Sequence, residues 1–182
     1  MKPATVADIL TFWFDHVGSE RWFGGDATAL DTEIRQRFSP LWEAERRSPI
    51  DRFLTDPGSA LAAMLLFDQF PRNMFRDTAR AFATDDLALS IAREAVRLGF
   101  DRQMPEAQRQ FAYMPFMHSE LRDDQDRANE LFATLADKEP LKFARQHQAV
   151  IERFGRFPTR NAALGRESTA EEKAFLKDAP QW

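Results

Sequence analysis

The sequence contains no cysteine and little glycine, and each of these shortages excludes a class of protein. Without cysteine there can be no disulfide bond, no thiolate nucleophile and no Cys-ligated zinc. Seven glycines in 182 residues argue against a β sandwich with many tight turns. The sequence has no run of 18 apolar residues, and the first 30 residues lack the pattern of a secretory signal. We therefore expect a cytoplasmic protein that does not cross a membrane.

The sequence also lacks an excess of positive charge and has few Ile and Val residues. The net charge of −4 argues against general binding to nucleic acid or to an anionic membrane. Ile and Val together number 9, whereas Ala numbers 26, and this composition favours helices over strands. No change in composition and no Ser/Gly-rich linker divides the chain. The sequence predicts a single all-α domain over residues 1–182 with about eight or nine helices, and it leaves the oligomeric state open.

The segment from 58 to 70 is predicted to be the central helix of the core. Residues 60–67 are apolar on every side of a helix, and a helix of that kind is buried all round. Pro71 is expected to end or kink it. Asp68 would then lie on a buried helix near its C-terminal end, where the helix dipole disfavours a negative charge. A carboxylate in that position needs a cationic partner.

Three short patterns mark where other helices begin. Asp56 followed by Pro57 is typical of an N-cap with proline at the first helical position. Thr84 precedes two acids that would face the positive end of the helix dipole, so it is predicted to be an N-cap. The residues 168–171 are predicted to form a capping box for a last short helix.

Two segments, 70–73 and 157–161, both place Arg-Asn shortly after Phe-Pro. The structural interpretation is that Pro stops a helix, Phe packs in the core and Asn caps freed backbone groups. The functional interpretation rests on charge, because residues 145–166 contain five Arg and only one acid, Glu152. Arginines beyond those needed to pair with a buried acid can bind carboxylates or phosphates.

The segment 113–120 is the third candidate. His118 and Glu120 are two residues apart, so on a helix they would not chelate one metal as an i, i+4 pair does. With three His and no Cys in the chain, we expect no metal and no cofactor. His118 is a candidate general base if it faces the arginines. The alternative is a structural hydrogen-bonding role for this side chain.

Three motifs in order resemble those of a bacterial family of unknown function, number 924 among such domains. Residues 67–76 resemble its hallmark, 113–120 its second motif and 153–166 its third, so the resemblance covers nearly the whole chain. It implies a tetratricopeptide-like α-α superhelix and implies no activity. Two positions depart from the family pattern: Thr159 stands where relatives usually have His, and Asp77 where they often have Gly.

We therefore expect a polar pocket where the three motifs meet, which binds a small anionic molecule with Arg as clamps. The residues expected to line or brace it are Asp68, Arg72, Asn73, Arg76, His118, Glu120, Arg156, Arg160 and Asn161. Three other interpretations stay open. The chain could be a scaffold that binds an acidic peptide in a helical groove, or an enzyme that uses His118 or Glu120 as acid or base. It could also hold a purely structural Arg–Asp network that binds no ligand.

Overall fold

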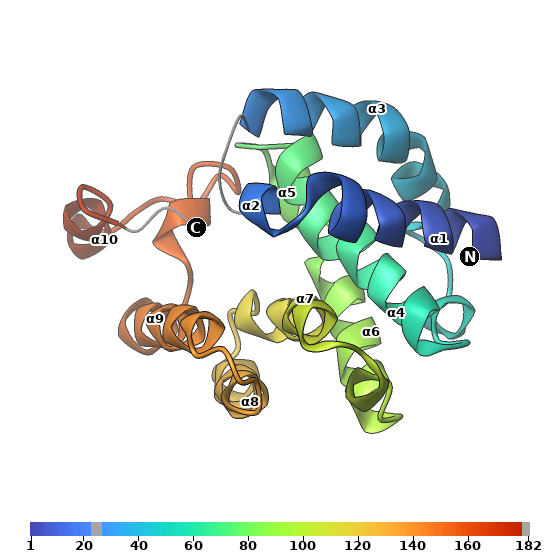
Figure 1. The fold of residues 1–182 in the computed structure, drawn as a ribbon. Coiled ribbons are helices and arrows are strands. Elements are labelled where there is room, and N and C mark those ends of the chain that lie inside the picture. Colours follow the sequence, from blue (N-terminus) through green and yellow to red (C-terminus); the bar gives the residue numbers. More distant parts are fainter. Residues whose placement is uncertain (23–26, 180–182) are drawn as a thin grey trace.

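Figure 1 shows the helices of the computed structural model. The structure describes residues 1–22 and 27–179, and every regular element in those ranges is an α-helix, a 3-10 helix or a π-helical turn. The α-helices are α1 (Pro3–Thr11), α2 (Ser19–Trp22), α3 (Ala27–Glu45), α4 (Pro57–Met64), α5 (Phe70–Met74), α6 (Asp85–Arg97), α7 (Glu106–Met117), α8 (Arg122–Ala133), α9 (Glu139–Phe154) and α10 (Ala170–Phe175). The shorter elements are η1 (Phe12–Val17), η2 (Ile50–Phe53), η3 (Leu65–Gln69), η4 (Ala79–Phe82), η5 (Asp101–Gln103) and η6 (Pro158–Arg160).

The predicted all-α fold class is confirmed. Because η3 joins α4 to α5, the ten α-helices of the described residues amount to nine continuous helical stretches, in line with the expected number. The finer predictions, a tetratricopeptide-like superhelix and a single domain over residues 1–182, stay predictions. Within residues 1–22 and 27–179, no helix combines the length and the apolar character needed to cross a membrane.

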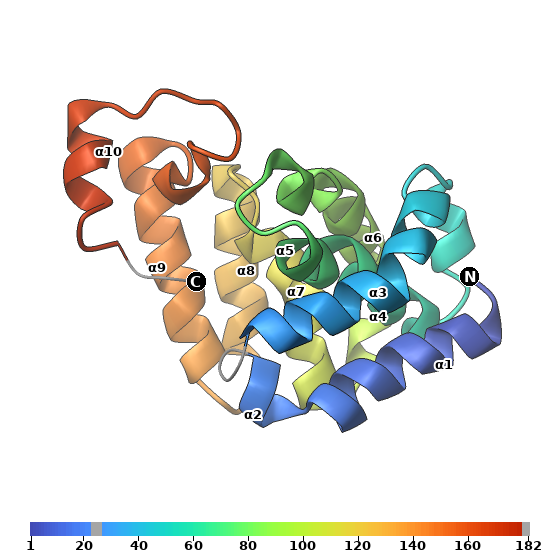
Figure 2. The same ribbon diagram turned by 90° about the horizontal axis from the view of Figure 1, so that it is seen from above.

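Helix α4 runs through the middle of the molecule, and α1, α6 and α7 pack against it (Figure 1). Helix α3 lies along α5 on one side. Helices α6 to α9 each pack against the next one along the chain, and Figure 2 shows α8 and α9 lying side by side. The segment after α9, residues 155–179, is called the C-terminal segment; it carries α10, which lies at the opposite edge of the molecule from α1 (Figures 1 and 2).

The main hydrophobic core surrounds α4 and η3. All residues from 60 to 67 are at most 1 % exposed, which confirms the predicted central helix. A second, smaller cluster lies apart from this core and consists of Val150, Ile151 and Phe157, with Phe154 and Phe175 packed against it. The C-terminal segment therefore has its own apolar contacts and is joined to the main core mostly through polar groups.

Pro71 lies inside the continuous helix and does not end it. Proline has no backbone N–H, so the carbonyl of Phe67, four residues earlier, loses its usual helical donor. The Thr84 hydroxyl donates to this carbonyl at 2.6 Å and accepts a hydrogen bond from Trp42 Nε1 at 3.1 Å. Thr84 does precede α6, but its side chain makes no capping bond, because its hydroxyl oxygen accepts from Trp42 instead of from a backbone N–H of α6.

Of the other two predicted helix starts, one is confirmed and one is shifted by a residue. Asp56 accepts a hydrogen bond from the Ser59 N–H at 2.9 Å, which confirms it as the N-cap of α4. The last capping box is present one residue later than predicted, between Thr169 and Glu172. Asp77, where the family resemblance implies Gly, adopts a positive φ of 61°. That is the left-handed conformation that glycine adopts most easily and that Asp tolerates better than most residues.

We expect Thr84→Val to destabilise the fold by about 2–4 kcal/mol. The substitution keeps the shape of the side chain but leaves two buried polar groups, the Phe67 carbonyl and the Trp42 indole N–H, without a partner. Equilibrium unfolding in urea measures the change. Thr78→Val is the matched control, because the Thr78 hydroxyl bonds the Phe75 carbonyl at an exposed site. Equal losses in both variants would contradict the role assigned to Thr84.

Candidate functional site

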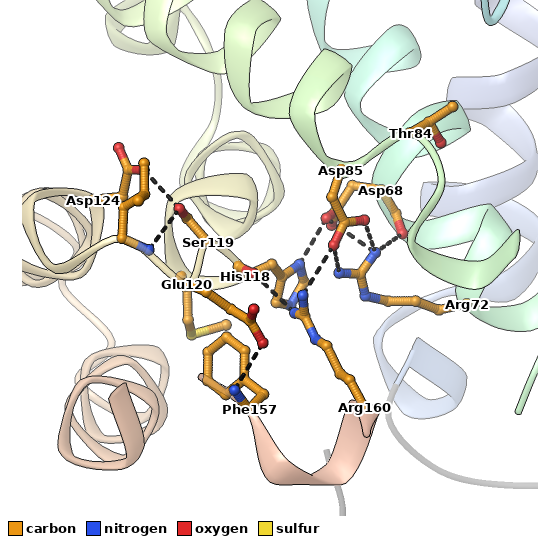
Figure 3. A network of polar contacts seen from close by, with 12 residues as sticks. Asp68, Arg72, Thr84, Asp85, His118, Ser119, Glu120, Asp124, Phe157 and Arg160 are labelled. Carbon is orange, nitrogen blue, oxygen red and sulfur yellow. Dashed lines mark hydrogen bonds and ion pairs between the residues drawn. The ribbon is translucent and has the colours of Figure 1, made fainter. Parts of the chain in front are cut away.

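Asp68 is the centre of a polar cluster inside the molecule. Its side chain is 1 % exposed, and Figure 3 shows the side chains of His118 and Arg72 directed at it. His118 Nδ1 lies 2.7 Å from Asp68 Oδ1, and Arg72 Nη1 lies 3.2 Å from the same oxygen. Arg72 also donates to the Asp68 backbone carbonyl at 2.6 Å, and the Gln69 amide donates to Oδ2. The buried carboxylate therefore has the cationic partner that its position on the helix requires.

Asp85 joins the cluster from the first residue of α6, where the helix dipole favours a negative charge. Arg72 donates to both of its carboxylate oxygens, at 3.0 and 2.9 Å, in a bidentate pair. Arg160 Nη1 reaches Asp85 Oδ2 at 3.3 Å. We call Asp68, Arg72, Asp85, His118 and Arg160 the Asp68 cluster. Its two carboxylates and two guanidinium groups balance in charge when His118 is neutral.

Arg160 is the member of the cluster that comes from the C-terminal segment, on η6. It donates to the His118 backbone carbonyl at 2.8 Å. Its guanidinium lies 4.8 Å from the ring centre of Phe82 and 4.6 Å from that of Phe157. Burial and the neighbouring Arg72 charge lower the pKa of Arg160 to about 10, so it stays protonated at neutral pH.

His118 is neutral in this setting. Burial, together with the positive charges of Arg72 and Arg160, lowers its pKa in spite of the opposing attraction of Asp68. The Arg72 and His118 partners in turn hold the pKa of Asp68 below its usual value, although burial opposes this. An ionised carboxylate only accepts hydrogen bonds, so Nδ1 carries the proton and Nε2 carries a lone pair.

The Nε2 edge of His118 is available. Within the described part of the chain no group forms a hydrogen bond with His118 Nε2. This atom is also not fully buried. The side chain as a whole is 13 % exposed. His118 Nε2 therefore reaches solvent while Nδ1 is held by a buried carboxylate.

The turn that carries His118 is held by two side chains of α8. Asp124 accepts a hydrogen bond from the Ser119 hydroxyl at 2.6 Å and one from Arg93 at 2.6 Å. Gln125 donates to the carbonyls of Met117 and Ser119, at 2.8 and 2.6 Å. These contacts fix the backbone on both sides of His118 after α7 ends at Met117.

Glu120 lies beside the cluster and holds the C-terminal segment. It accepts the backbone N–H of Phe157 at 2.8 Å and a bidentate pair from Arg166 at 2.8 and 3.0 Å. Burial raises the pKa of Glu120, but the hydrogen bonds from Arg166 and Phe157 outweigh it and lower the pKa overall. Both oxygens of Glu120 are therefore engaged in joining the second motif to the third.

The remaining residues of the predicted pocket lie elsewhere. Asn73 donates to Asp31 on α3 at 2.8 Å. Arg76 donates to both oxygens of the same carboxylate, at 2.8 and 2.9 Å. Arg156 pairs with Glu172 at 2.7 and 2.9 Å, and the Asn161 amide donates to the Ser168 hydroxyl at 3.0 Å. The structure thus brings together Asp68, Arg72, His118 and Arg160, places Glu120 next to them, and assigns the other four to separate contacts.

Sequence reasoning missed several partners that the structure supplies. From the sequence, Asp85 is visible only as an acid at a helix start, and Phe82 and Arg166 are not among the residues expected in the site. Among the described residues, no three His, Cys, Asp or Glu side chains are close enough to hold a metal ion. Two surface hollows of about 380 and 280 Å³ are lined by residues outside the Asp68 cluster.

Comparison with known proteins confirms the resemblance seen in the three motifs. The family model described as bacterial protein of unknown function (DUF924) matches residues 9–180. The solved structure of the protein of unknown function ATU0120 from Agrobacterium tumefaciens is 44 % identical, with a TM-score of 0.90. That alignment covers 97 % of this chain and 98 % of the other. No curated protein matches the chain. These findings support the fold and assign no activity.

We expect the free energy of unfolding to fall as the pH drops below about 6.5. Burial, with the nearby His118, lowers the pKa of His147 to about 3, and the pKa of His118 is also lowered. As the pH falls, these histidines bind protons in the unfolded chain but stay neutral in the folded chain. Each of them therefore lowers the free energy of unfolding by about 1.4 kcal/mol per pH unit between its unfolded and folded pKa values. Urea unfolding at a series of pH values measures the slope.

The His147→Gln variant provides the comparison for this slope. Gln can still donate to the Phe143 carbonyl, which His147 Nδ1 contacts at 2.8 Å, but it does not titrate. The free energy of unfolding of this variant should fall less steeply between pH 6 and pH 4. The difference in slope should correspond to the uptake of about one proton. An identical slope in both proteins would show that His147 is not held neutral by the fold.

Proposed function

We propose that this chain, which belongs to the bacterial family of proteins of unknown function DUF924, binds a small anionic molecule at the Asp68 cluster. The observation that carries the proposal is the set of unused polar atoms at the solvent edge of the cluster. His118 Nε2 has no hydrogen-bonding partner among the described residues. Toward the described residues, Arg160 uses one N–H of each terminal nitrogen, for Asp85 and for the His118 carbonyl, and its Nε has no partner among them.

These atoms suit an anion of a particular kind. Guanidinium N–H groups donate to carboxylate or phosphate oxygens. The lone pair of neutral His118 accepts a hydrogen bond, so the ligand should carry a donor close to its anionic group. The rings of Phe82 and Phe157 pack against the Arg160 guanidinium and hold it in place. A small hydroxy acid or a monoprotonated phosphate has this combination of groups.

A purely structural network would also pair Asp68 and Asp85 with the two arginines. The difference lies in the edge that faces solvent. The Arg166–Glu120 pair shows the structural pattern, since both carboxylate oxygens and the neighbouring backbone groups are engaged. In the Asp68 cluster, by contrast, His118 and Arg160 keep polar atoms without a hydrogen-bonding partner among the described residues. This difference favours ligand binding.

The proposal predicts that inorganic phosphate, citrate or lactate raises the melting temperature. A ligand at 100 times its dissociation constant adds about 2.7 kcal/mol. For a protein of this size that corresponds to roughly 5–10 °C. The Arg160→Gln variant should lose this shift, because it removes the guanidinium donors. Differential scanning fluorimetry over a concentration series provides the measurement.

Arg153→Gln is the matched control for Arg160→Gln. Arg153 belongs to the same Arg-rich segment, but it is 54 % exposed and pairs with Glu171. This variant should keep the full ligand-induced shift. If none of the three anions shifts the melting temperature, or if Arg160→Gln responds like wild type, the cluster is a structural network and the proposal is wrong.

A second candidate function is binding of an acidic peptide, and the larger hollow favours it. This hollow of about 380 Å³ is lined by Arg93, Val96, Arg97, Phe116, Asp124 and Arg127. Arg97 and Arg127 pair with Glu94 and Glu130 on the surface, and exposed pairs of this kind exchange partners at little cost. Arg93 is paired with Asp124 at 2.6 Å, so Arg97 and Arg127 would take acidic side chains, and Val96 and Phe116 would contact apolar ones.

This second candidate predicts that a short labelled peptide of alternating Glu and Leu binds in a salt-dependent manner. Arg97→Glu should weaken binding by about tenfold or more, because it replaces an attraction with a repulsion at the rim. Fluorescence anisotropy measures the affinity. Arg145→Glu makes the same charge change at an exposed position of α9 outside the hollow, and should have little effect. Equal weakening by both variants would indicate non-specific attraction.

A further inference from the structure

The Asp68–His118 pair has the arrangement of an oriented general base. A buried, ionised carboxylate accepts the Nδ1 proton at 2.7 Å and so fixes both the tautomer and the direction of the ring. The opposite atom, Nε2, has an unshared electron pair that reaches solvent. Contacts of Asp124 and Gln125 hold the turn from Met117 to Ser119, so the ring is positioned from the backbone as well.

The groups around this base restrict the chemistry open to it. No hydroxyl among the described residues is hydrogen-bonded to His118, and the neighbouring Ser119 hydroxyl donates to Asp124 instead. A serine nucleophile activated by this histidine is therefore not assembled. The cation that contacts the same residue is Arg160, whose guanidinium donates to the His118 backbone carbonyl at 2.8 Å and keeps unused N–H groups.

A base and a cation side by side suit proton transfer at carbon. We propose that His118 acts as a general base that removes a proton from the carbon next to a carbonyl group in a small anionic substrate. Asp68 is the positioning residue that holds the ring, and Arg160 stabilises the negative charge that develops on the carbonyl oxygen. The inference rests on the anion-binding function proposed above, and it names the substrate class as a carbonyl compound that bears a carboxylate or a phosphate.

The step needs no further reactant. The carbon–hydrogen bond breaks and its proton moves to His118 Nε2, while its electron pair forms the carbon–carbon double bond of an enolate. The carbonyl electrons move onto oxygen, where the Arg160 guanidinium donates hydrogen bonds. Return of a proton from Nε2 to the same carbon restores the carbonyl compound and neutral His118, which completes one exchange of carbon-bound hydrogen.

Exchange of carbon-bound hydrogen for deuterium tests the proposal directly. The purified protein is incubated in D₂O with pyruvate, 2-oxoglutarate or dihydroxyacetone phosphate, and loss of the proton signal next to the carbonyl is followed by NMR. We expect at least one of these probes to exchange roughly 10²-fold faster than in buffer alone, the lower end of general-base catalysis. The carboxylate and phosphate probes also distinguish which anionic group the site accepts.

Two substitutions of the same kind separate the base from the rest of the protein. His118→Gln should reduce exchange to the buffer rate, because it removes the Nε2 base. His16→Gln is the matched control, since His16 is a surface histidine 55 % exposed and 3.3 Å from Glu33. This control should exchange at the wild-type rate. Equal rates in wild type and His118→Gln would overturn the proposal.

A thermal-shift measurement with the same probes keeps the two proposals apart. Binding without exchange in the wild-type protein would overturn catalysis and leave anion binding in place. No exchange, together with no thermal shift from these probes or from phosphate, citrate and lactate, would overturn both. Loss of exchange in a folded His118→Gln variant that still binds the probe would support the base assignment.

A measurement on the unmodified protein covers the case in which His118→Gln does not fold. Long-range ¹H–¹⁵N NMR of the histidine rings reports which ring nitrogen is protonated. We expect the Nδ1–H tautomer of His118 at neutral pH, with Nε2 unprotonated. A ring protonated at Nε2 would have no free electron pair toward solvent, and the proposal would be wrong.

Discussion

The burial of one carboxylate, that of Asp68, is the constraint from which the polar interior follows. A negative charge at 1 % exposure on a helix surrounded by apolar side chains is tolerated only with charged and hydrogen-bonding partners. Arg72 supplies the charge and His118 a hydrogen bond. Arg72 then needs a second acid, because it is itself partly buried, and Asp85 provides both of its oxygens. Asp85 in turn attracts Arg160, which brings the C-terminal segment onto the core.

The same stretch of chain also contains a backbone carbonyl that needs a hydrogen-bond donor. Pro71 removes a helical hydrogen bond just where the charged side chains begin, and the Thr84 hydroxyl replaces it. Thr84 directly precedes Asp85, so the residue that satisfies the Phe67 carbonyl also sets the position of the acid that pairs with Arg72. The hydrogen bond from Thr84 to the Phe67 carbonyl and the ion pair of Asp85 with Arg72 are therefore linked by the start of α6. Changing either contact disturbs the other.

Local features of the site could be predicted from the sequence, and distant pairings could not. The composition of residues 60–67 is enough to predict a buried helix, and the place of Asp68 on it predicts a cationic partner. Nothing in the sequence indicates that Asp85 joins Arg72 and Arg160, since 75 residues separate it from Arg160. Arg156 was assigned to the pocket because it lies in an Arg-rich motif. It turns instead toward Glu172, whose capping role appears only when the box is placed one residue later.

Charge balance alone does not distinguish a structural network from a binding site, and the protonation state of His118 determines how a binding site here would attract an anion. If His118 were charged, the cluster would carry an excess positive charge, and an anion would simply neutralise it. With His118 neutral, the two acids and two arginines already cancel, so attraction for an anion must come from directed hydrogen bonds at the solvent edge. Directed bonds select ligands by shape and by donor pattern as well as by charge. The arrangement that keeps His118 uncharged is therefore also the one that would make the site selective, and it leaves a basic nitrogen at the place where a bound anion would lie.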